Sequence, residues 1–593
     1  MRQNRFQTKN SNQTKEYFCS GYVNSNSDNI EDLQCLPVDN SNSDFLVSSR
    51  HNSPKNPQMI YVNSKNKSLT QTGTTWATAF SDLQHALDLA STLPASEIWI
   101  SKGVYIPTKI YSPNGITGGA YGHAFPSQAT NSGLLTFNIP NNTSIFGGFH
   151  GNESRLADRD PHRNETVLSG GKISWHVVTL GNDIAKTGVT AKLNGLTIAN
   201  GYALGPTPST FPIFGPLTYA HSFGGGIYST FGSNLTLEKV LVTENSAGNT
   251  NTGASGYGGG LLSNNSTLTI KECKFTFNTS TIEGGGLEVL NTFETTPHIA
   301  SISDSIFENN NATLFGSAIT TEGSQGNIGS YVQVNKCTFR NNSAQYGGSF
   351  AMDSLQTNLS DCKFENNYAD VAGGALSTAN IVNTISYGAI SKTPSVIFTT
   401  EIKGCIFKNN LASGNQILHD LQLGGTAAGL DFGLGGGAIV VYMNGRANIS
   451  DTEFIGNMAT NGDGGAILNG RAAAVDPLGI PVIAVNVNTS IINCNFVDNK
   501  IKNGFGGAIA SLPSTYPFPN LPRLNLNETI LTVKNSNFEF NKSIKGGAIY
   551  TYFTTLTEDD NNFKKNEGKL GESLYSLEST TNGDFHPLKV SSN

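Results

Sequence analysis

The stretch Cys494–Ile509 reads CNFVDNKIKNGFGGAI and contains two phrases that recur through most of the chain. The first phrase is Phe-x-x-Asn, here Phe496 to Asn499. The second is a pair of small residues followed by a short apolar run, here Gly506 to Ile509. Self-similarity of this kind is the sequence signature of a repeat architecture.

The Phe-x-x-Asn phrase has a phenylalanine and an asparagine at fixed positions, and both are expected to form ladders along the fold. The phenylalanines are Phe275, Phe307, Phe339, Phe364, Phe407, Phe454, Phe496, Phe538 and Phe563. The asparagines are Asn278, Asn310, Asn342, Asn367, Asn410, Asn457, Asn499, Asn541 and Asn566. A degenerate copy, Val242 to Asn245, precedes them.

The spacing of the phrases predicts one coil of a solenoid for each copy. Successive phenylalanines are 25 to 47 residues apart, and the shortest spacing is informative because insertions only lengthen a period. The apolar runs are short and bounded by Gly and Asn, which favours strands over helices. A unit of about 25 residues fits a solenoid coil, whereas the blades of a propeller need about 40–50 residues.

Each phrase has a mechanical explanation in such a coil. Parallel coils stack about 4.8 Å apart, so equivalent Phe, Ile and Leu side chains form continuous ladders in the core. The glycine pair is expected to supply tight corners. The asparagine is expected to tolerate a left-handed backbone and to pass amide hydrogen bonds to the next coil. We therefore predict an all-β fold, a right-handed single-stranded parallel β-helix of about thirteen coils with a small α/β N-terminal cap.

The remaining sequence divides the chain into four parts. Residues 1–57 are polar and are expected to be a disordered or leader segment. Residues 58–110 predict a strand–helix–strand cap that covers the open end of the solenoid. Residues 111–579 are assigned to the β-helix, and residues 580–593 to a tail. The predicted helix of the cap has an apolar face made by Trp76, Ala79, Leu83, Ala86, Leu87 and Ala90.

Charge and hydropathy exclude some classes of function. A net charge of −7 disfavours a nucleic-acid-binding protein. No apolar stretch approaches the 18 residues of a membrane span. The basic beginning of the chain is not followed by the apolar region of a secretory signal peptide.

The alternating phrases resemble the repeats of the chlamydial polymorphic outer-membrane proteins and of related bacterial right-handed β-helix proteins. The similarity covers about Gly224 to Asn566. The segments Ile60–Asn63, Thr75–Gln84 and Gly147–Glu153 resemble the N-terminal part of many secreted bacterial β-helix proteins. The resemblance implies an extracellular or cell-surface protein, often an adhesin. It carries no catalytic residues, and this chain is expected to lack the autotransporter barrel of that family.

Five of the seven cysteines share one position of the repeat. Cys273, Cys337, Cys362, Cys405 and Cys494 each lie two residues before a repeat phenylalanine. Ser, Thr or Asn occupies that position in other copies, so the position tolerates any small side chain. No spacing typical of a metal site occurs, and we predict free thiols in a buried ladder.

Acidic residues are the candidates for catalysis, because β-helix polysaccharide lyases and hydrolases work with carboxylates. Lyases of this fold use a calcium cluster and a base, and hydrolases use paired carboxylates. The candidates Asp361, Asp370, Asp431, Asp451, Asp463 and Asp498 are scattered in sequence. Asp304, Asp361 and Asp451 share a repeat position with Glu272, Lys336 and Gly404, which favours a solvated face.

The sequence therefore supports two hypotheses of function. The first is adhesion or ligand binding through the insertion loops, outside the cell or at its surface, with no catalytic, cofactor-binding or metal-binding residue. Its partner would be a host-cell, matrix or polysaccharide ligand, and not nucleic acid. The alternative is a polysaccharide lyase or glycoside hydrolase of the pectin-lyase-like type, working beside loops 203–222, 411–435 and 470–487. A cofactor is expected only for a lyase, which would need calcium.

Overall fold

In the computed structural model the chain forms two compact units, Met1–Ser53 and Pro54–Asn593. Apart from the short strands named below, the structure describes residues 57–110, 131–182, 187–204, 222–248, 256–291, 296–323, 329–380, 398–415, 434–442, 445–470, 487–512, 529–582 and 584–591. Everything that follows concerns these residues.

The first unit contains a three-stranded antiparallel sheet. Its strands are β1 (Gln7–Thr8), β2 (Lys15–Ser20) and β3 (Gln34–Val38), paired in the order β1-β2-β3. The backbone register places Cys19 opposite Cys35. The sequence analysis did not predict this sheet.

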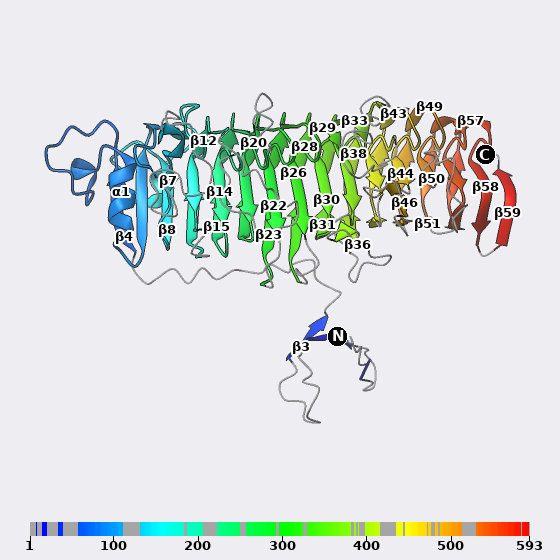
Figure 1. The fold of residues 1–593 in the computed structure, drawn as a ribbon, viewed down its shortest axis with the longest axis horizontal. Helices are drawn as coiled ribbons and strands as arrows, with labels where there is room; N and C mark the ends of the chain where they lie inside the picture. The colour runs from blue at the N-terminus through cyan, green and yellow to red at the C-terminus, as the bar shows by residue number, and fades with distance from the viewer. Residues whose placement is uncertain are drawn as a thin grey trace. The chain divides into compact units, whose positions relative to one another are not determined.

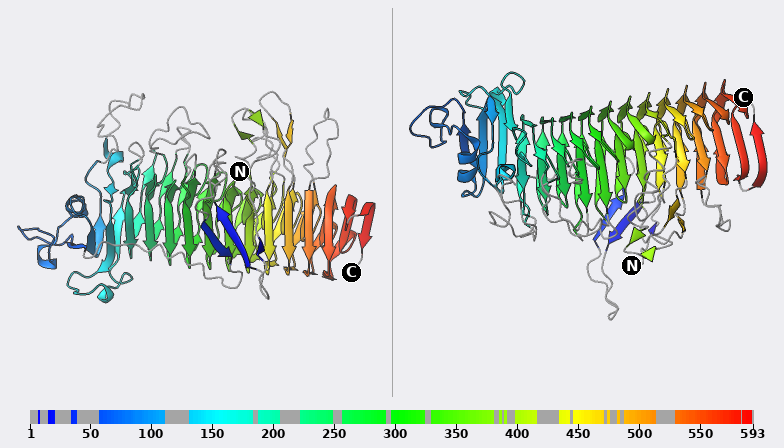
Figure 2. Two further views of the ribbon diagram at one scale, coloured as in Figure 1. Left: turned by 90° about the horizontal axis from the view of Figure 1, so that it is seen from below. Right: turned by 45° about the horizontal axis from the view of Figure 1, so that its top comes forward.

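The second unit is a parallel β-solenoid, as predicted (Figure 1). A typical coil begins with a strand after the glycine pair, turns into a second strand, then into a third that carries the repeat phenylalanine, and ends with a fourth after the repeat asparagine. The first two strands of every coil belong to a 28-stranded sheet, here named the long sheet. The third strands form a 13-stranded phenylalanine sheet, and the fourth strands form an 11-stranded third sheet. Both views of Figure 2 show the coils following one another in chain order.

The strands of the phenylalanine sheet correspond to the thirteen coils expected. They are β6 (Gly103–Tyr105), β9 (Thr166–Ser169), β12 (Thr197–Ala199), β16 (Leu241–Thr243), β20 (Lys274–Thr276), β24 (Ile306–Glu308), β28 (Thr338–Arg340), β32 (Lys363–Glu365), β38 (Ile406–Lys408), β42 (Glu453–Ile455), β48 (Asn495–Val497), β52 (Asn537–Glu539) and β56 (Asn562–Lys564). The third sheet contains β13 (Tyr202–Ala203), β17 (Ser246–Ala247), β21 (Thr279–Ser280), β25 (Asn311–Ala312), β29 (Ser343–Tyr346), β33 (Tyr368–Ala372), β39 (Leu411–Ala412), β43 (Met458–Asn461), β49 (Lys500–Asn503), β53 (Lys542–Lys545) and β57 (Glu567–Leu570).

The long sheet begins in the cap and contains two rows of strands along the repeats. Its early strands are β4 (Gln58–Val62), β5 (Ser96–Ser101), β7 (Phe137–Asn138), β8 (Thr143–Phe149), β10 (Val178–Leu180) and β11 (Thr190–Asn194). The first row follows the glycine pairs: β14 (Ile227–Thr230), β18 (Leu261–Asn264), β22 (Leu287–Asn291), β26 (Ile319–Gly323), β30 (Phe350–Asp353), β34 (Leu376–Ala379), β40 (Ile439–Val441), β44 (Ile467–Gly470), β50 (Ile509–Leu512), β54 (Ile549–Tyr552) and β58 (Leu574–Thr581). The second row is β15 (Asn234–Glu238), β19 (Thr267–Lys271), β23 (Ile299–Ser303), β27 (Tyr331–Asn335), β31 (Gln356–Ser360), β37 (Thr400–Lys403), β41 (Arg446–Ser450), β47 (Asn488–Ile492), β51 (Thr529–Lys534) and β55 (Thr554–Asp559).

Two ladders hold the coils together, and both were predicted. The rings from Phe275 to Phe563 stack in chain order, for example with centroids 4.7 Å apart and planes 2° apart between Phe454 and Phe496. Beside them, each repeat asparagine binds the next one. The side chain of Asn499 donates from Nδ2 to Asn541 Oδ1 at 3.0 Å and to Phe454 O at 2.9 Å. The degenerate copy joins this ladder, because Asn245 donates to Asn278 Oδ1 at 3.0 Å.

The left-handed backbone lies one residue earlier than the asparagine ladder. The residue before each repeat asparagine has a positive φ, for example 54° at Asn309 and 55° at Asn366, whereas Asn310 and Asn367 do not. A short polar residue tolerates this conformation best, which explains why Asn recurs there as well. The repeat asparagine is therefore needed for its four side-chain hydrogen bonds and not for a left-handed backbone conformation.

The two glycines of each pair have different roles. The first has a positive φ, 71° at Gly506, so any side chain would be strained there. The second lies against the neighbouring coil, and a Cβ on Gly507 would be 2.0 Å from Gly547 O. One corner therefore requires glycine twice, once for conformation and once for space.

The N-terminal cap combines the predicted strands with a shorter helix than expected. Helix α1 (Leu83–Ala90) starts at the N-cap Asp82, whose carboxylate accepts the His85 N–H at 3.0 Å. Trp76 therefore lies outside α1, in the 3-10 turn η1 (Trp76–Thr78), and packs on Tyr61 at 4.8 Å. The buried face of α1 joins the main core, as predicted.

Several smaller elements complete the unit. Two further 3-10 turns are η2 (Asn131–Leu134) and η3 (Leu156–Asp158). Antiparallel strand pairs occur at β35 (Ile385–Ser386) with β36 (Ala389–Ile390), and at β45 (Ala473–Val475) with β46 (Pro481–Ile483). At the C-terminal end, β59 (Asp584–Ser591) pairs antiparallel with β58, in a segment that the sequence analysis assigned to a tail. No helix of the described residues is long and apolar enough to cross a membrane.

The five repeat cysteines are free and buried, as predicted. Burial raises the pKa of the Cys273 thiol to about 12, so it is not ionised near neutral pH. These cysteines therefore act as small core residues.

Candidate functional site

The aspartates considered from the sequence do not form a site. Asp304, Asp361 and Asp451 are exposed and have φ values of 51–53°, in the turn between the long sheet and the phenylalanine sheet. Gly404 has the same left-handed conformation at that position. The structure thus supports a solvated row of turn residues over a catalytic row.

Three of the other four aspartates, Asp370, Asp463 and Asp498, lie in different coils. Asp370 accepts the Tyr368 hydroxyl at 2.7 Å, and Asp498 forms an ion pair with Lys500 at 2.8 Å. Asp463 accepts the Phe505 N–H at 2.9 Å, and burial raises the pKa of its carboxyl to about 6. Asp431 and most of the three long loops lie outside the described residues.

The outer face of the first row of the long sheet carries a cluster that the sequence analysis missed. Side chains of a strand alternate between the two faces of its sheet. In β22, Leu287 and Val289 enter the main core, so Glu288 and Leu290 point to the outer face. That outer face is apolar on both sides of Glu288. One apolar group contains Phe223, Tyr228, Leu262, Leu290 and Tyr257. The other includes Phe315, Tyr346, Val440 and Tyr442.

Three carboxyl groups meet on this apolar face. Glu283, Glu288 and Glu322 each have a carboxylate oxygen within 4.8 Å of the others. Glu283 precedes the glycines of its coil, Glu288 follows them in β22, and Glu322 comes from β26 of the next coil. Parallel register brings them together, because Glu288 lies opposite Thr320 and Leu290 lies opposite Glu322. We name these three residues the glutamate cluster.

The environment of the glutamate cluster favours the neutral form of each carboxyl. Glu288 is completely buried, whereas Glu283 and Glu322 are half-buried. Burial, together with nearby Asp353, raises the pKa of Glu283 to about 8. Burial and the neighbouring carboxyls raise the pKa of Glu288 and of Glu322 well above that of an ordinary glutamate. Three carboxylates so close together cannot all ionise without a compensating charge.

Aromatic residues continue the row in which Glu283 lies. Tyr257, Glu283, Phe315 and Tyr346 occupy equivalent positions of four successive coils. Phe315 and Tyr346 stack with ring centroids 5.2 Å apart. Aromatic walls with a few convergent polar groups are typical of binding sites for small molecules and sugars.

The sequence contained one signal for this site. Glu288 occupies the first-row position where Tyr228 and Leu262 stand in the two preceding coils. Later coils have Thr320, Ala351 and Ser377 at this position, so Glu288 is a charged residue in a row of uncharged ones. The presence of Glu288 indicates a site only together with Glu283 and Glu322. That these three residues converge follows only from the register between coils.

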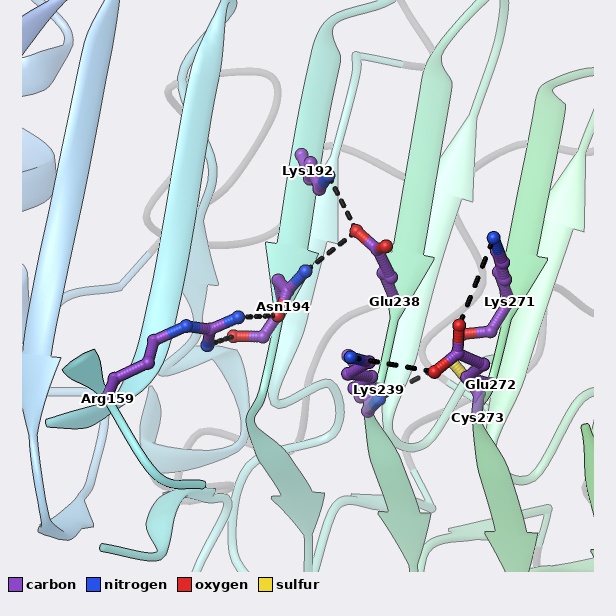
Figure 3. A network of polar contacts seen from close by, with 9 residues as sticks. Arg159, Lys192, Asn194, Glu238, Lys239, Lys271, Glu272 and Cys273 are labelled. Atoms are coloured by element: carbon purple, nitrogen blue, oxygen red, sulfur yellow. Dashed lines mark hydrogen bonds and ion pairs between the residues drawn. The ribbon is translucent and has the colours of Figure 1, made fainter. Parts of the chain in front are cut away.

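A second, polar region lies on the first coils (Figure 3). Arg159 donates to the side chain of Asn194, and Asn194 donates to Glu238 at 2.8 Å. Lys192 also binds Glu238, at 2.6 Å. On the next coil, Glu272 lies between Lys239 and Lys271, at 3.6 and 3.9 Å (Figure 3). Each of these carboxylates is therefore paired with a cation.

A groove of about 680 Å³ lies beside this network. Its lining includes His162, Glu165, Thr197, Lys239, Glu272 and Lys274. Both signs of charge occur, and Lys239 and Lys274 form ion pairs with Glu272 and Glu308. The groove therefore offers polar contacts of both charges for a ligand.

The two regions differ in the chemistry that they allow. A carboxyl of raised pKa can donate a proton, and an ionised neighbour can attack carbon or activate water. The glutamate cluster has such groups, and its three oxygens are also a donor set for a hard cation. The groove of the early coils supports binding alone.

Comparison with known proteins gives fold-level similarity only. No protein-family model matches the chain, and no curated protein matches it in sequence. Among solved structures, the chain is similar to the Azotobacter vinelandii mannuronan C-5 epimerase AlgE4 A-module, with 11% identity, a TM-score of 0.32, and coverage of 88% of this chain and 100% of that one. It is also similar to the catalytic domain of a GH87 α-1,3-glucanase, D1069A, in complex with tetrasaccharides. There the identity is 12%, the TM-score 0.38, and the coverage 93% of this chain and 71% of that one.

Proposed function

We propose that the protein is a carbohydrate-active enzyme that hydrolyses glycosidic bonds at the glutamate cluster. The observation that carries this proposal is the convergence of Glu283, Glu288 and Glu322 on an outer sheet face lined by aromatic rings. Glycoside hydrolysis needs a carboxylic acid and a carboxylate on either side of the bond. A lyase would act through a base and a cation, whereas carboxyls of raised pKa supply the acid that hydrolysis needs.

Each of the two half-buried carboxyls has a role in the proposed reaction. Glu322, whose pKa is raised well above that of an ordinary glutamate, donates its proton to the glycosidic oxygen as the bond to the anomeric carbon breaks. The carboxylate of Glu283, which lies beside Glu322, attacks the anomeric carbon. Water then releases the sugar from Glu283 and returns a proton to Glu322. Carboxyls about 5 Å apart are typical of this retaining course.

The test uses the purified full chain with a panel of acidic and neutral polysaccharides, in the presence of a metal chelator. New reducing ends are the readout. We expect cleavage of at least one polysaccharide and a fall of about 100-fold or more for Glu322→Gln. Glu453→Gln is the matched control, because Glu453 is exposed in β42 and belongs neither to the cluster nor to the groove. No cleavage of any substrate, or full activity of Glu322→Gln, would refute the proposal.

A second candidate function is binding without cleavage, as in the adhesins that the repeats resemble. The observation that favours it is the 680 Å³ groove on the early coils. In this case a polysaccharide or a host-cell or matrix ligand would be retained intact, and the protein would act at the cell surface or outside the cell. Retention that is lost in Lys239→Ala but kept in Glu322→Gln would select this candidate.

A further inference from the structure

The glutamate cluster has the geometry of a cation site. The three carboxylate oxygens lie within 4.8 Å of one another. Calcium binds oxygen at about 2.3–2.6 Å, so two oxygens on opposite sides of the ion are about 4.6–5.2 Å apart. Small rotations of the three side chains would therefore place all three oxygens around one ion.

Glu288 provides an independent indication that something binds there. It is completely buried, and neither carboxylate oxygen has a hydrogen-bond partner. A buried polar group without a partner is rare in folded proteins, and a carboxyl group has four lone-pair sites to satisfy. Its carboxyl lies against the turn, since a Cβ on Gly284 would be 2.6 Å from Glu288 Oε2. Glycine thus leaves the space that this carboxyl occupies beside Glu283.

The described residues supply no positive charge to the cluster. Glu308, by comparison, is held by Lys274 and by Arg340, whose Nη2 is 2.5 Å away. No such lysine, arginine or histidine forms an ion pair with Glu283, Glu288 or Glu322 in the part of the chain that the structure describes. Buried carboxylates are normally paired or coordinate a metal.

We propose that Glu283, Glu288 and Glu322 bind a divalent cation of the calcium type. Oxygen donors of this kind select hard cations. Calcium accepts many oxygen ligands in a flexible geometry, whereas magnesium demands a near-ideal octahedron and keeps several waters, so a site of three protein carboxylates suits calcium better. Glu283 and Glu322 are half-buried and give the ion a route from solvent, while Glu288 holds it from the protein side.

The cation site uses the carboxyls of the proposed hydrolytic centre, and this relation has a consequence for activity. An oxygen of Glu322 that coordinates a cation cannot also carry the proton for the leaving group. The cation is therefore expected to inhibit cleavage. Binding itself requires no activity, so the two proposals can fail separately.

The experiment measures binding to the full chain after treatment with a chelator and its removal. Calcium chloride or magnesium chloride is titrated into the protein in a calorimeter, and thermal unfolding is followed at millimolar concentrations of each salt. We expect calcium binding with a Kd on the order of 10⁻⁴ M, an upward shift of the melting temperature, and weaker binding of magnesium.

Variants locate the site. Glu288→Gln keeps the shape of the side chain and is expected to weaken calcium binding at least about tenfold, because one of three charged ligands is lost. Glu322→Gln serves the same purpose if Glu288→Gln does not fold. Glu453→Gln, at an exposed residue outside both sites, is the control and should bind calcium like the parent chain.

Two results would overturn the cation site. One is the absence of calorimetric heat and of any calcium-dependent shift for the parent chain. The other is unchanged calcium binding by both cluster variants. Cleavage without cation binding would refute the cation site and support the hydrolase. Cation binding without cleavage would refute the hydrolase and support the cation site.

Discussion

The asparagine ladder makes a quantitative prediction at Asn457. Its Oδ1 accepts from the backbone N–H of Asn410 at 3.0 Å and from the Asn410 side chain at 2.9 Å. Its Nδ2 donates to Phe407 O at 2.9 Å and to Asn499 Oδ1 at 3.0 Å. Asn457→Ala therefore removes four hydrogen bonds from a residue that is completely buried.

The cost follows from these four bonds. A buried hydrogen bond contributes about 1 kcal/mol net, and a partner left unsatisfied costs about 1–3 kcal/mol. Some partners keep another bond, since the Asn410 side chain still donates to Phe364 O. We expect Asn457→Ala to lower the free energy of opening of its coil by about 4–6 kcal/mol.

The matched control is Asn503→Ala. Asn503 also donates to an asparagine of the neighbouring coil, Asn461, at 3.0 Å, but it is exposed to solvent. Water can replace that bond, so the expected cost is about 0.5 kcal/mol or less.

Native-state hydrogen exchange with peptide resolution measures the difference. In Asn457→Ala the amides of β42 and β48 should exchange roughly 10³- to 10⁴-fold faster than in the parent chain, and those of distant coils should change much less. If both variants exchange alike in these strands, the ladder does not stabilise the coils as argued.

Two further predictions concern His176 and Gly507. His176 is buried beside Tyr228, and burial lowers the pKa of its imidazole from 6.5 to about 4. A histidine kept neutral by the fold contributes its full stability above pH 6.5, so His176 should contribute a loss of about 3 kcal/mol between pH 6.5 and 4. His176→Phe should lose about that much less in chemical unfolding over the same range; equal losses would contradict this assignment. Gly507→Ala places a methyl group 2.0 Å from Gly547 O and should cost more than about 4 kcal/mol or prevent folding. Gly232→Ala, at a φ of 70° with open space around it, should cost only about 1–2 kcal/mol; similar melting temperatures of the two variants would disprove the close contact.

The solenoid could be predicted from the sequence because each coil needs the same residue types at its ladder positions. A phenylalanine such as Phe364 must meet the rings before and after it, so the same residue type recurs wherever a coil is present. The asparagine ladder recurs for the same reason. What the pattern did not locate was the left-handed residue, because Asn309 and Asn310 are neighbours of the same type.

The glutamate cluster could not be predicted because nothing about it repeats. Glu283 stands where neighbouring coils have Tyr257 and Phe315, and Glu322 comes from the far end of its own strand. Their meeting depends on the register of β22 against β26, which the phrases alone do not determine. The row of Asp304, Asp361 and Asp451 shows the reverse case. It is regular in sequence because a turn needs it, and it is exposed.

The hydrogen bonds from one repeat asparagine side chain to the next all run the same way, from each coil toward the one that follows it in the chain. The solenoid therefore has a polarity, like a filament whose two ends are different. A coil copied elsewhere in the chain would meet matching donors and acceptors only in the same orientation. Coils duplicated in tandem and in frame satisfy that condition automatically. The solenoid can therefore lengthen by duplication of the gene segment that encodes a coil, while the outer surfaces of the copies diverge.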